Sequence, residues 1–188
     1  MSESLATEAT RRQLSARQAD TARRLTEAGV DEVRQAGYES LSIRDVARRA
    51  GVAAATAYTY FVSKDHLLTE IFWRRLNALP PVGRDQPPAK ARAVAVLREL
   101  ALLVSEEPEL AAGCAAAMFG SEPDVRQLRL QIGTEIHQRI EAAAGPGSAA
   151  ARLLELAYFG AMVEAGLGYT TYRHMAGQLA EAAELIMG

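Results

Sequence analysis

The spacing of apolar residues along the chain predicts helices and leaves no segment with the alternation of a strand. In the first such segment the apolar positions recur at intervals of three and four residues: Ala22, Leu25, Gly29 and Val33. Ser15, followed three residues later by Gln18, matches a capping box, and Gly37 stands where a glycine commonly ends a helix. We therefore predict a first helix over about Ala16–Ala36.

Two shorter helices are predicted next, joined by a tight turn. Ser42 with Asp45 gives a helix start and Gly51 gives its end, while the second short helix covers about Ala54–Phe61. The apolar positions of the first one share a face: Ile43, Val46, Ala47 and Ala50. Two short helices with such a turn are typical of a helix-turn-helix, in which the start of the second helix enters the DNA major groove.

Longer helices are predicted for the remainder of the chain. Their approximate bounds are Ser63–Leu79, Ala89–Glu106, Pro108–Phe119, Pro123–Ala144, Ser148–Leu167 and Thr170–Met187. Four prolines between the first two of them (Pro80, Pro81, Pro87 and Pro88) mark a loop. The expected fold class is all-α.

Composition narrows the possible partners. The longest apolar run, Leu110–Gly120, is far shorter than the roughly 18 residues that a membrane span needs, and Met1–Thr10 has no apolar signal segment, so we expect no membrane and a cytoplasmic location. Cys114 is the one cysteine, and no Cys/His cluster has metal-ligand spacing, so we expect neither metal nor cofactor. The net charge of −2 divides into +2 over residues 1–75 and −4 over residues 76–188, which alone decides little.

The segment Leu41–Leu67 resembles the signature of the tetracycline-repressor (TetR) family of regulators. An Ala-Gly-Val turn (residues 50–52) precedes Thr-Ala-Tyr-Thr-Tyr-Phe (residues 56–61) and Ser-Lys-Asp-His-Leu (residues 63–67). The resemblance implies an N-terminal three-helix DNA-binding domain and a C-terminal helical domain for ligand binding and dimerisation. It suggests a helix-turn-helix domain over 15–63 and a ligand-binding and dimerisation domain over 64–188. Residues 1–14 have no apolar period, so we expect a flexible arm there.

The same resemblance assigns DNA contacts residue by residue. The expected phosphate contacts are Thr56, Tyr58, Tyr60 and Lys64, and the positions that face base edges are Ala54, Ala55 and Thr59. Core packing is the alternative for Tyr58 and Tyr60, and we expect Phe61 in the core. Arg44 is either a further phosphate contact or a solvated helix charge. Ala53 stands where many relatives carry Ser or Thr, so the recognition helix is expected to lack a side-chain N-cap.

The ligand and the dimer are less specified by the sequence. Apolar residues at helical spacing are more often plain core than cavity lining. With that alternative, the candidate cavity residues are Leu100, Leu103, Cys114, Met118, Phe119, His137, Tyr158, Phe159 and Met162. Because basic residues are few there, we expect an unknown small-molecule effector that is largely apolar. The resemblance implies a homodimer through about Ser148–Leu167 and Thr170–Met187, and a two-fold dimer requires a pseudo-palindromic operator.

The expected function is therefore a DNA-binding repressor of transcription that a small molecule releases, and not an enzyme. One alternative is an all-helical enzyme or ligand carrier with an incidental helix-turn-helix, although no paired carboxylates, nucleophile-base set or phosphate-binding glycine loop occurs in the sequence. Another is a DNA-binding activator, or a regulator that answers a partner protein instead of a metabolite.

Overall fold

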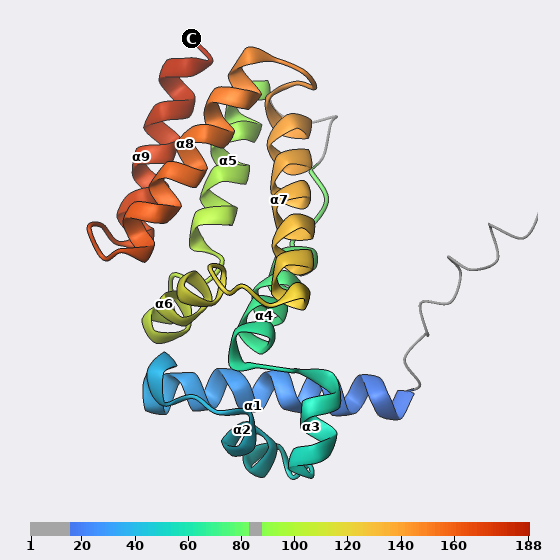
Figure 1. The fold of residues 1–188 in the computed structure, drawn as a ribbon. Helices are drawn as coiled ribbons and strands as arrows, with labels where there is room; N and C mark the ends of the chain where they lie inside the picture. Colours follow the sequence, from blue (N-terminus) through green and yellow to red (C-terminus); the bar gives the residue numbers. More distant parts are fainter. Residues whose placement is uncertain (1–15, 83–87) are drawn as a thin grey trace, which may run out of the picture.

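The computed structural model describes residues 16–82 and 88–188, and within them all regular secondary structure is helical (Figure 1). The helices are α1 (Ala16–Ser40), α2 (Ile43–Ala50), α3 (Ala54–Tyr60), α4 (Lys64–Ala78), α5 (Ala89–Leu102), α6 (Pro108–Ala117), α7 (Pro123–Ala144), α8 (Ala149–Gly166) and α9 (Tyr172–Ile186). The predicted all-α fold is confirmed. The expected arm and the Ser15 cap lie outside the described residues.

The end of the first helix agrees with the prediction in one respect, and the end of α5 differs from it. At Gly37 the backbone of α1 leaves helical geometry with φ 73° and ψ 169°, the position where the sequence predicted the helix to end. Helix α5 ends at Leu102 and not at Glu106, because Ser105 and Glu107 donate to carbonyls three residues back (Leu102 and Val104). The proline at 108 disfavours helical backbone at Glu107, which separates this turn from the start of α6.

The first three helices form a unit of their own at one end of the molecule. In Figure 1, α1 crosses beneath the remaining helices, with α2 and α3 on its far side. The core of this three-helix unit consists of buried side chains from all three helices and from the segment that follows them, including Leu25, Val33, Val46, Ala57 and Phe61. The second unit contains the upright helices α5, α7, α8 and α9, and α4 and α6 lie between the two.

Helix α6 joins the two units through close packing and ion pairs. A Cβ on Gly113 would lie 3.0 Å from Leu68 Cδ1 and 3.3 Å from Val33 Cγ2, so glycine allows α6 to approach both α1 and α4. Glu107, just before α6, pairs with Arg34 of α1 at 2.7 Å and with Arg75 of α4 at 2.6 Å. A shift of α6 would therefore act on both other helices. The expected division at residues 63/64 stays a prediction.

A buried arginine fixes the end of α4 against α7. Arg139 donates to the carbonyls of Pro80 at 2.9 Å and Leu79 at 3.1 Å, and its Nε lies 2.7 Å from Glu135 Oε1. These partners offset the cost of burying a cation. In the described residues no helix is both long and apolar enough to cross a membrane.

Candidate DNA-binding surface and ligand cavity

The helix-turn-helix is defined by caps at both ends of α2. Ser42 Oγ accepts a hydrogen bond from the amide of Asp45 at 3.2 Å, as the sequence predicted. Gly51 adopts left-handed backbone with φ 64° and ψ 37°, and Val52 donates to the Ala47 carbonyl at 2.9 Å. The chain can therefore reverse within three residues and begin α3 at Ala54.

Arg24 of α1 also holds this turn, and sequence reasoning missed it. Its Nη2 donates to the carbonyls of Ala50 and Gly51, the latter at 3.3 Å. These carbonyls lie at the negative end of α2, where a cation is favourable. No local spacing relates Arg24 to residues 26 positions later, so only the fold identifies its role.

Helix α3 turns its first residues to solvent. Ala57 is fully buried, whereas Ala54, Ala55, Thr56 and Thr59 are exposed and Tyr58 is 42% exposed. Ala53 provides no side-chain cap, as expected, so the free N–H groups of the first turn remain available to a phosphate. The hydroxyl of Thr59 donates to the Thr56 carbonyl at 2.6 Å.

The two other aromatic positions of this segment differ in burial. Phe61 is 3% exposed and its ring packs edge-on against His66, with the centroids 5.6 Å apart, so the expected core position is confirmed. Tyr60 is half-buried, with its ring centroid 6.5 Å from that of Phe61. Arg44 is exposed on the first turn of α2. Their roles at DNA stay predictions.

Lys64 is engaged within the protein at the start of α4. Its Nζ donates to the carbonyls of Tyr38 at 2.9 Å and Glu39 at 3.2 Å, and it lies 4.1 Å from the centroid of the Tyr38 ring. Tyr38 donates to Asp65 at 2.7 Å, and burial together with this carboxylate raises the pKa of Tyr38. An ammonium carries three donors, so Lys64 retains one for a phosphate while it ties α4 to the end of α1.

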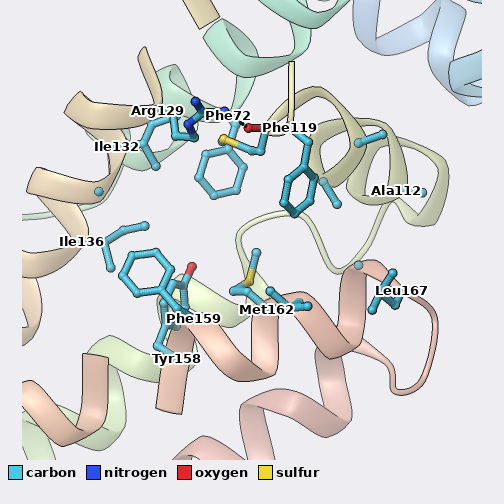
Figure 2. A pocket seen from close by; sticks show the side chains of 16 residues that line it. Phe72, Ala112, Phe119, Arg129, Ile132, Ile136, Tyr158, Phe159, Met162 and Leu167 are labelled. Atoms are coloured by element: carbon cyan, nitrogen blue, oxygen red, sulfur yellow. Dashed lines mark hydrogen bonds between the residues drawn. The ribbon is translucent and has the colours of Figure 1, made fainter. Parts of the chain in front are cut away.

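A cavity of about 710 Å³ opens between α4, α6, α7 and α8 (Figure 2). Five predicted residues line it: Met118, Phe119, Tyr158, Phe159 and Met162. Sequence reasoning missed others that face them, including Phe72 of α4 and Arg129, Ile132 and Ile136 of α7. The helical spacing of these residues shows that they share a face, but it does not show which helix that face packs against. No sequence signal therefore distinguishes them from ordinary core residues.

The other four candidates lie elsewhere, which corrects their assignment to this cavity. Leu100 is buried on α5, Leu103 lies in the turn after α5, and His137 is exposed on α7 with Nδ1 2.9 Å from Glu155 Oε2. Cys114 lines a smaller adjoining cavity of about 30 Å³, which shares Phe72 and Met118 with the large one, and its thiol donates to the Leu68 carbonyl at 3.5 Å. Burial raises the pKa of Cys114 to about 12, so the group is a neutral thiol.

Two lining residues, Arg129 and Tyr158, carry side-chain nitrogen or oxygen among the sixteen around the large cavity. Arg129 Nη1 donates to the carbonyls of Met118 at 2.6 Å and Gly120 at 3.3 Å, which fixes the end of α6 against α7. Tyr158 is 1% exposed. The arrangement suits an apolar ligand with few polar groups.

Comparison with known proteins identifies the family. The model of bacterial regulatory proteins, tetR family, matches residues 25–71. An uncharacterised HTH-type transcriptional regulator of Mycobacterium tuberculosis is 43% identical over 175 residues, which is 91% of this chain and 82% of the relative. The chain belongs to the TetR family. It is therefore a DNA-binding transcriptional regulator and not an enzyme, which removes the enzyme alternative.

Solved TetR-family structures have the same fold. A TetR regulator from Rhodococcus superposes with a TM-score of 0.68 at 22% identity, over 87% of this chain and 95% of that chain. The regulator FadR of Bacillus subtilis, solved in complex with stearoyl-CoA, superposes with a TM-score of 0.62 at 19% identity, over 86% of this chain and 96% of that chain. At these identities the likeness concerns the fold.

Proposed function

We propose that this TetR regulator is a homodimeric repressor that binds a pseudo-palindromic operator through α3 and leaves it when a largely apolar ligand fills the cavity. It acts in the bacterial cytoplasm, where its DNA lies. The observation that carries the DNA-binding part is the exposed start of α3, held in place by the caps of α2 and by Arg24. A short helix with small exposed residues at its start fits the major groove, which is about 12 Å wide.

Small side chains at the start of α3 suggest a division of labour in DNA recognition. Ala54 and Ala55 have no hydrogen-bonding side chains, so they read bases through contact with thymine methyl groups, and Thr59 adds a hydroxyl. Thr56, Tyr58, Tyr60 and Lys64 hold the phosphates together with the amides of α3, and Arg44 is a further candidate for this role.

The dimer is supported by an apolar stripe on α8. Its members recur at intervals of three and four residues on the exposed side: Leu153, Leu156, Gly160 and Val163, followed by Leu167 just after the helix. Val163 and Leu167 also border the mouth of the cavity. This spacing is that of a helix-packing seam, and an exposed stripe of this kind indicates a partner. Helix α9 contributes less, because its apolar residues Met175, Leu179 and Ala183 are already buried within the chain and Leu185 is its one large apolar side chain that is strongly exposed. We therefore propose that α8 forms most of the interface.

The ligand class follows from the cavity walls. A volume of about 710 Å³ lies within the usual range of small-molecule sites, and almost every lining side chain is apolar. FadR of Bacillus subtilis, which has the same fold, holds stearoyl-CoA, so a long apolar chain is the first class to test. The ligand would act through α6, which lines the cavity and contacts α1 and α4.

The test is fluorescence anisotropy with labelled fragments of the gene's own promoter region. We expect binding to one pseudo-palindromic fragment that weakens steeply as salt rises. Ala54→Ser or Thr59→Ala should change which fragment is preferred, whereas Tyr60→Phe should weaken binding to all fragments by a similar factor. Equal affinity for every fragment would contradict operator recognition, and higher transcription in the presence of the ligand-free protein would favour an activator over a repressor.

A further inference from the structure

The hydroxyl of Tyr158 is an unpaired polar group in an otherwise apolar place. The residue is 1% exposed, and its hydroxyl has no hydrogen-bond partner among the described residues. Figure 2 shows its oxygen on the side of the ring that faces the cavity, and neighbouring side chains cover it, because the oxygen itself is buried. Native proteins rarely leave a buried hydroxyl unpaired, because doing so costs about 1–3 kcal/mol.

Protein groups around Tyr158 do not remove this cost. Its neighbour on α8, Phe159, packs edge-on against it with the centroids 5.5 Å apart and supplies no acceptor. The hydroxyl of Tyr172, which acts electrostatically on Tyr158, donates to the Ala111 carbonyl at 3.4 Å and makes no hydrogen bond to Tyr158. Arg129, the other polar lining residue, is seen in Figure 2 on the opposite side of the cavity and is directed to the carbonyls at the end of α6. A water molecule needs two to four polar partners, and a water at Tyr158 would find few among these side chains.

The protonation state fixes which kind of partner is missing. Burial raises the pKa of Tyr158, so the phenol keeps its proton at physiological pH and can donate. A neutral phenol donates one hydrogen bond and can also accept one, so its partner can be an oxygen on whatever fills the cavity, either a carbonyl that receives the hydrogen bond or a hydroxyl. A purely hydrocarbon ligand would leave the hydroxyl unpaired and would exclude water from it as well.

We propose that the ligand of this cavity is an apolar molecule with an acceptor oxygen inside its enclosed part, a ketone or alcohol oxygen that receives a hydrogen bond from Tyr158. This inference rests on the proposed function, since it names the ligand class of the same cavity. Tyr158 is then the residue that selects an oxygenated apolar ligand over the parent hydrocarbon chain, because a site built around a buried donor rejects analogues that lack the acceptor.

The first experiment examines the ligand-free protein and needs no ligand. Tyr158→Phe removes the hydroxyl and keeps the ring, so thermal unfolding should occur at the same temperature or higher. The matched control is Tyr172→Phe, whose hydroxyl donates to the Ala111 carbonyl at 3.4 Å and whose loss should lower the midpoint slightly. A midpoint for Tyr158→Phe that falls by more than about 3 °C would show that the hydroxyl has a partner in the empty protein and would overturn the proposal.

The second experiment measures ligand preference by isothermal titration calorimetry. The probes are stearic acid and the series of oxostearic acids that carry one ketone at successive positions. We expect at least one ketone to bind the wild type about tenfold more tightly than stearic acid, equivalent to about 1.4 kcal/mol. Tyr158→Phe should remove that preference while leaving its affinity for stearic acid within about twofold of the wild type.

The outcomes separate this inference from the proposed function. If stearic acid and all ketones bind with equal affinity in both proteins, the cavity accepts apolar chains and only the role of Tyr158 is overturned. If no probe binds, both the apolar chain as ligand class and the role of Tyr158 are overturned. A ketone preference that survives Tyr158→Phe would place the acceptor contact elsewhere and would also overturn the proposal.

Discussion

The two functional regions of this regulator are built in opposite ways. Around the helix-turn-helix, polar groups hold the backbone: Ser42 caps α2, Arg24 binds its last carbonyls, and Lys64 ties α4 to α1. The exposed surface at the start of α3 carries small side chains, Ala54 and Ala55, that form no hydrogen bonds. Around the cavity most contacts are apolar: Arg129 is its one lining residue that anchors backbone carbonyls, at the end of α6, and Tyr158 contributes a buried hydroxyl.

This difference separates rigidity from adaptability. A hydrogen bond to a backbone carbonyl restricts both the distance and the angle between donor and acceptor, so it holds the backbone in one position. A helix that must enter the major groove requires such a fixed position. Apolar contacts have no such direction, so a cavity lined by methionine and phenylalanine can adjust to ligands of different shape. We expect substitutions of polar anchors to affect the DNA-binding region far more than the cavity.

The largest effect is expected from Arg24→Met, which keeps the aliphatic stem and removes the guanidinium. The carbonyls of Ala50 and Gly51 lose a charged donor, which should lower the free energy of unfolding by about 1–2 kcal/mol and weaken operator binding. Urea denaturation and anisotropy measure the two effects. The control is Arg23→Met, one residue earlier, whose exposed side chain pairs, among the described residues, with Asp20 and Glu27 of the same helix.

Unchanged DNA affinity in Arg24→Met would show that α2 and α3 keep their geometry without this anchor. An equal loss in Arg23→Met would instead point to the general positive charge of α1. Either result would weaken the comparison, since it assigns the rigidity of the helix-turn-helix to specific hydrogen bonds.

The two regions also differ in how far the sequence predicts them. Ser42, Gly51 and Ser63 act on backbone within a few residues; the hydroxyl of Ser63, for example, accepts from the His66 amide at 3.1 Å. Their spacing was therefore enough to locate α2, α3 and the start of α4. Arg24 and Arg139 act on carbonyls 26 or more residues away, and nothing in their neighbours distinguishes them from solvated charges.

The cavity was only partly predictable for the same reason. Its walls come from four helices, and a helix face that lines an open space has the same apolar pattern as one that packs tightly. Leu100 and Phe159 are both large apolar residues at helical spacing, yet Leu100 is buried on α5 away from the cavity and Phe159 lines it. The difference lies in which helix is opposite, and that depends on the whole fold.

A smaller, stabilising effect is expected from Ala53→Ser. Ala53 already has the extended backbone of an N-cap, with φ −61° and ψ 137°, but no side chain to accept from the first turn of α3. A serine hydroxyl should add about 0.5–1 kcal/mol and raise the melting temperature by about 1–4 °C. Ala55→Ser, inside the same helix, is the control and should give no increase. A lower melting temperature for Ala53→Ser would mean that the capping geometry is not available.

The smallest effect is expected at the exposed contact between His137 of α7 and Glu155 of α8, and it depends on pH. The carboxylate of Glu155 accepts from His137 at 2.9 Å, and with Glu141 at 3.6 Å it raises the pKa of His137 above its ordinary value of 6.5. Because the folded-state pKa is the higher one, this contribution to stability is complete below about pH 6.5 and disappears as the pH rises through the folded-state value.

His137→Gln should therefore lower the melting temperature of the protein slightly in acidic buffer and leave it unchanged in alkaline buffer. The side chain is exposed and its ion pairs are screened by salt, so the acidic difference should also shrink as sodium chloride is added. His174→Gln is the control, because that exposed histidine on α9 has no ion pair among those found in the described residues. A difference that grows toward alkaline pH would contradict the assigned contact between α7 and α8, because only the protonated imidazole attracts both carboxylates.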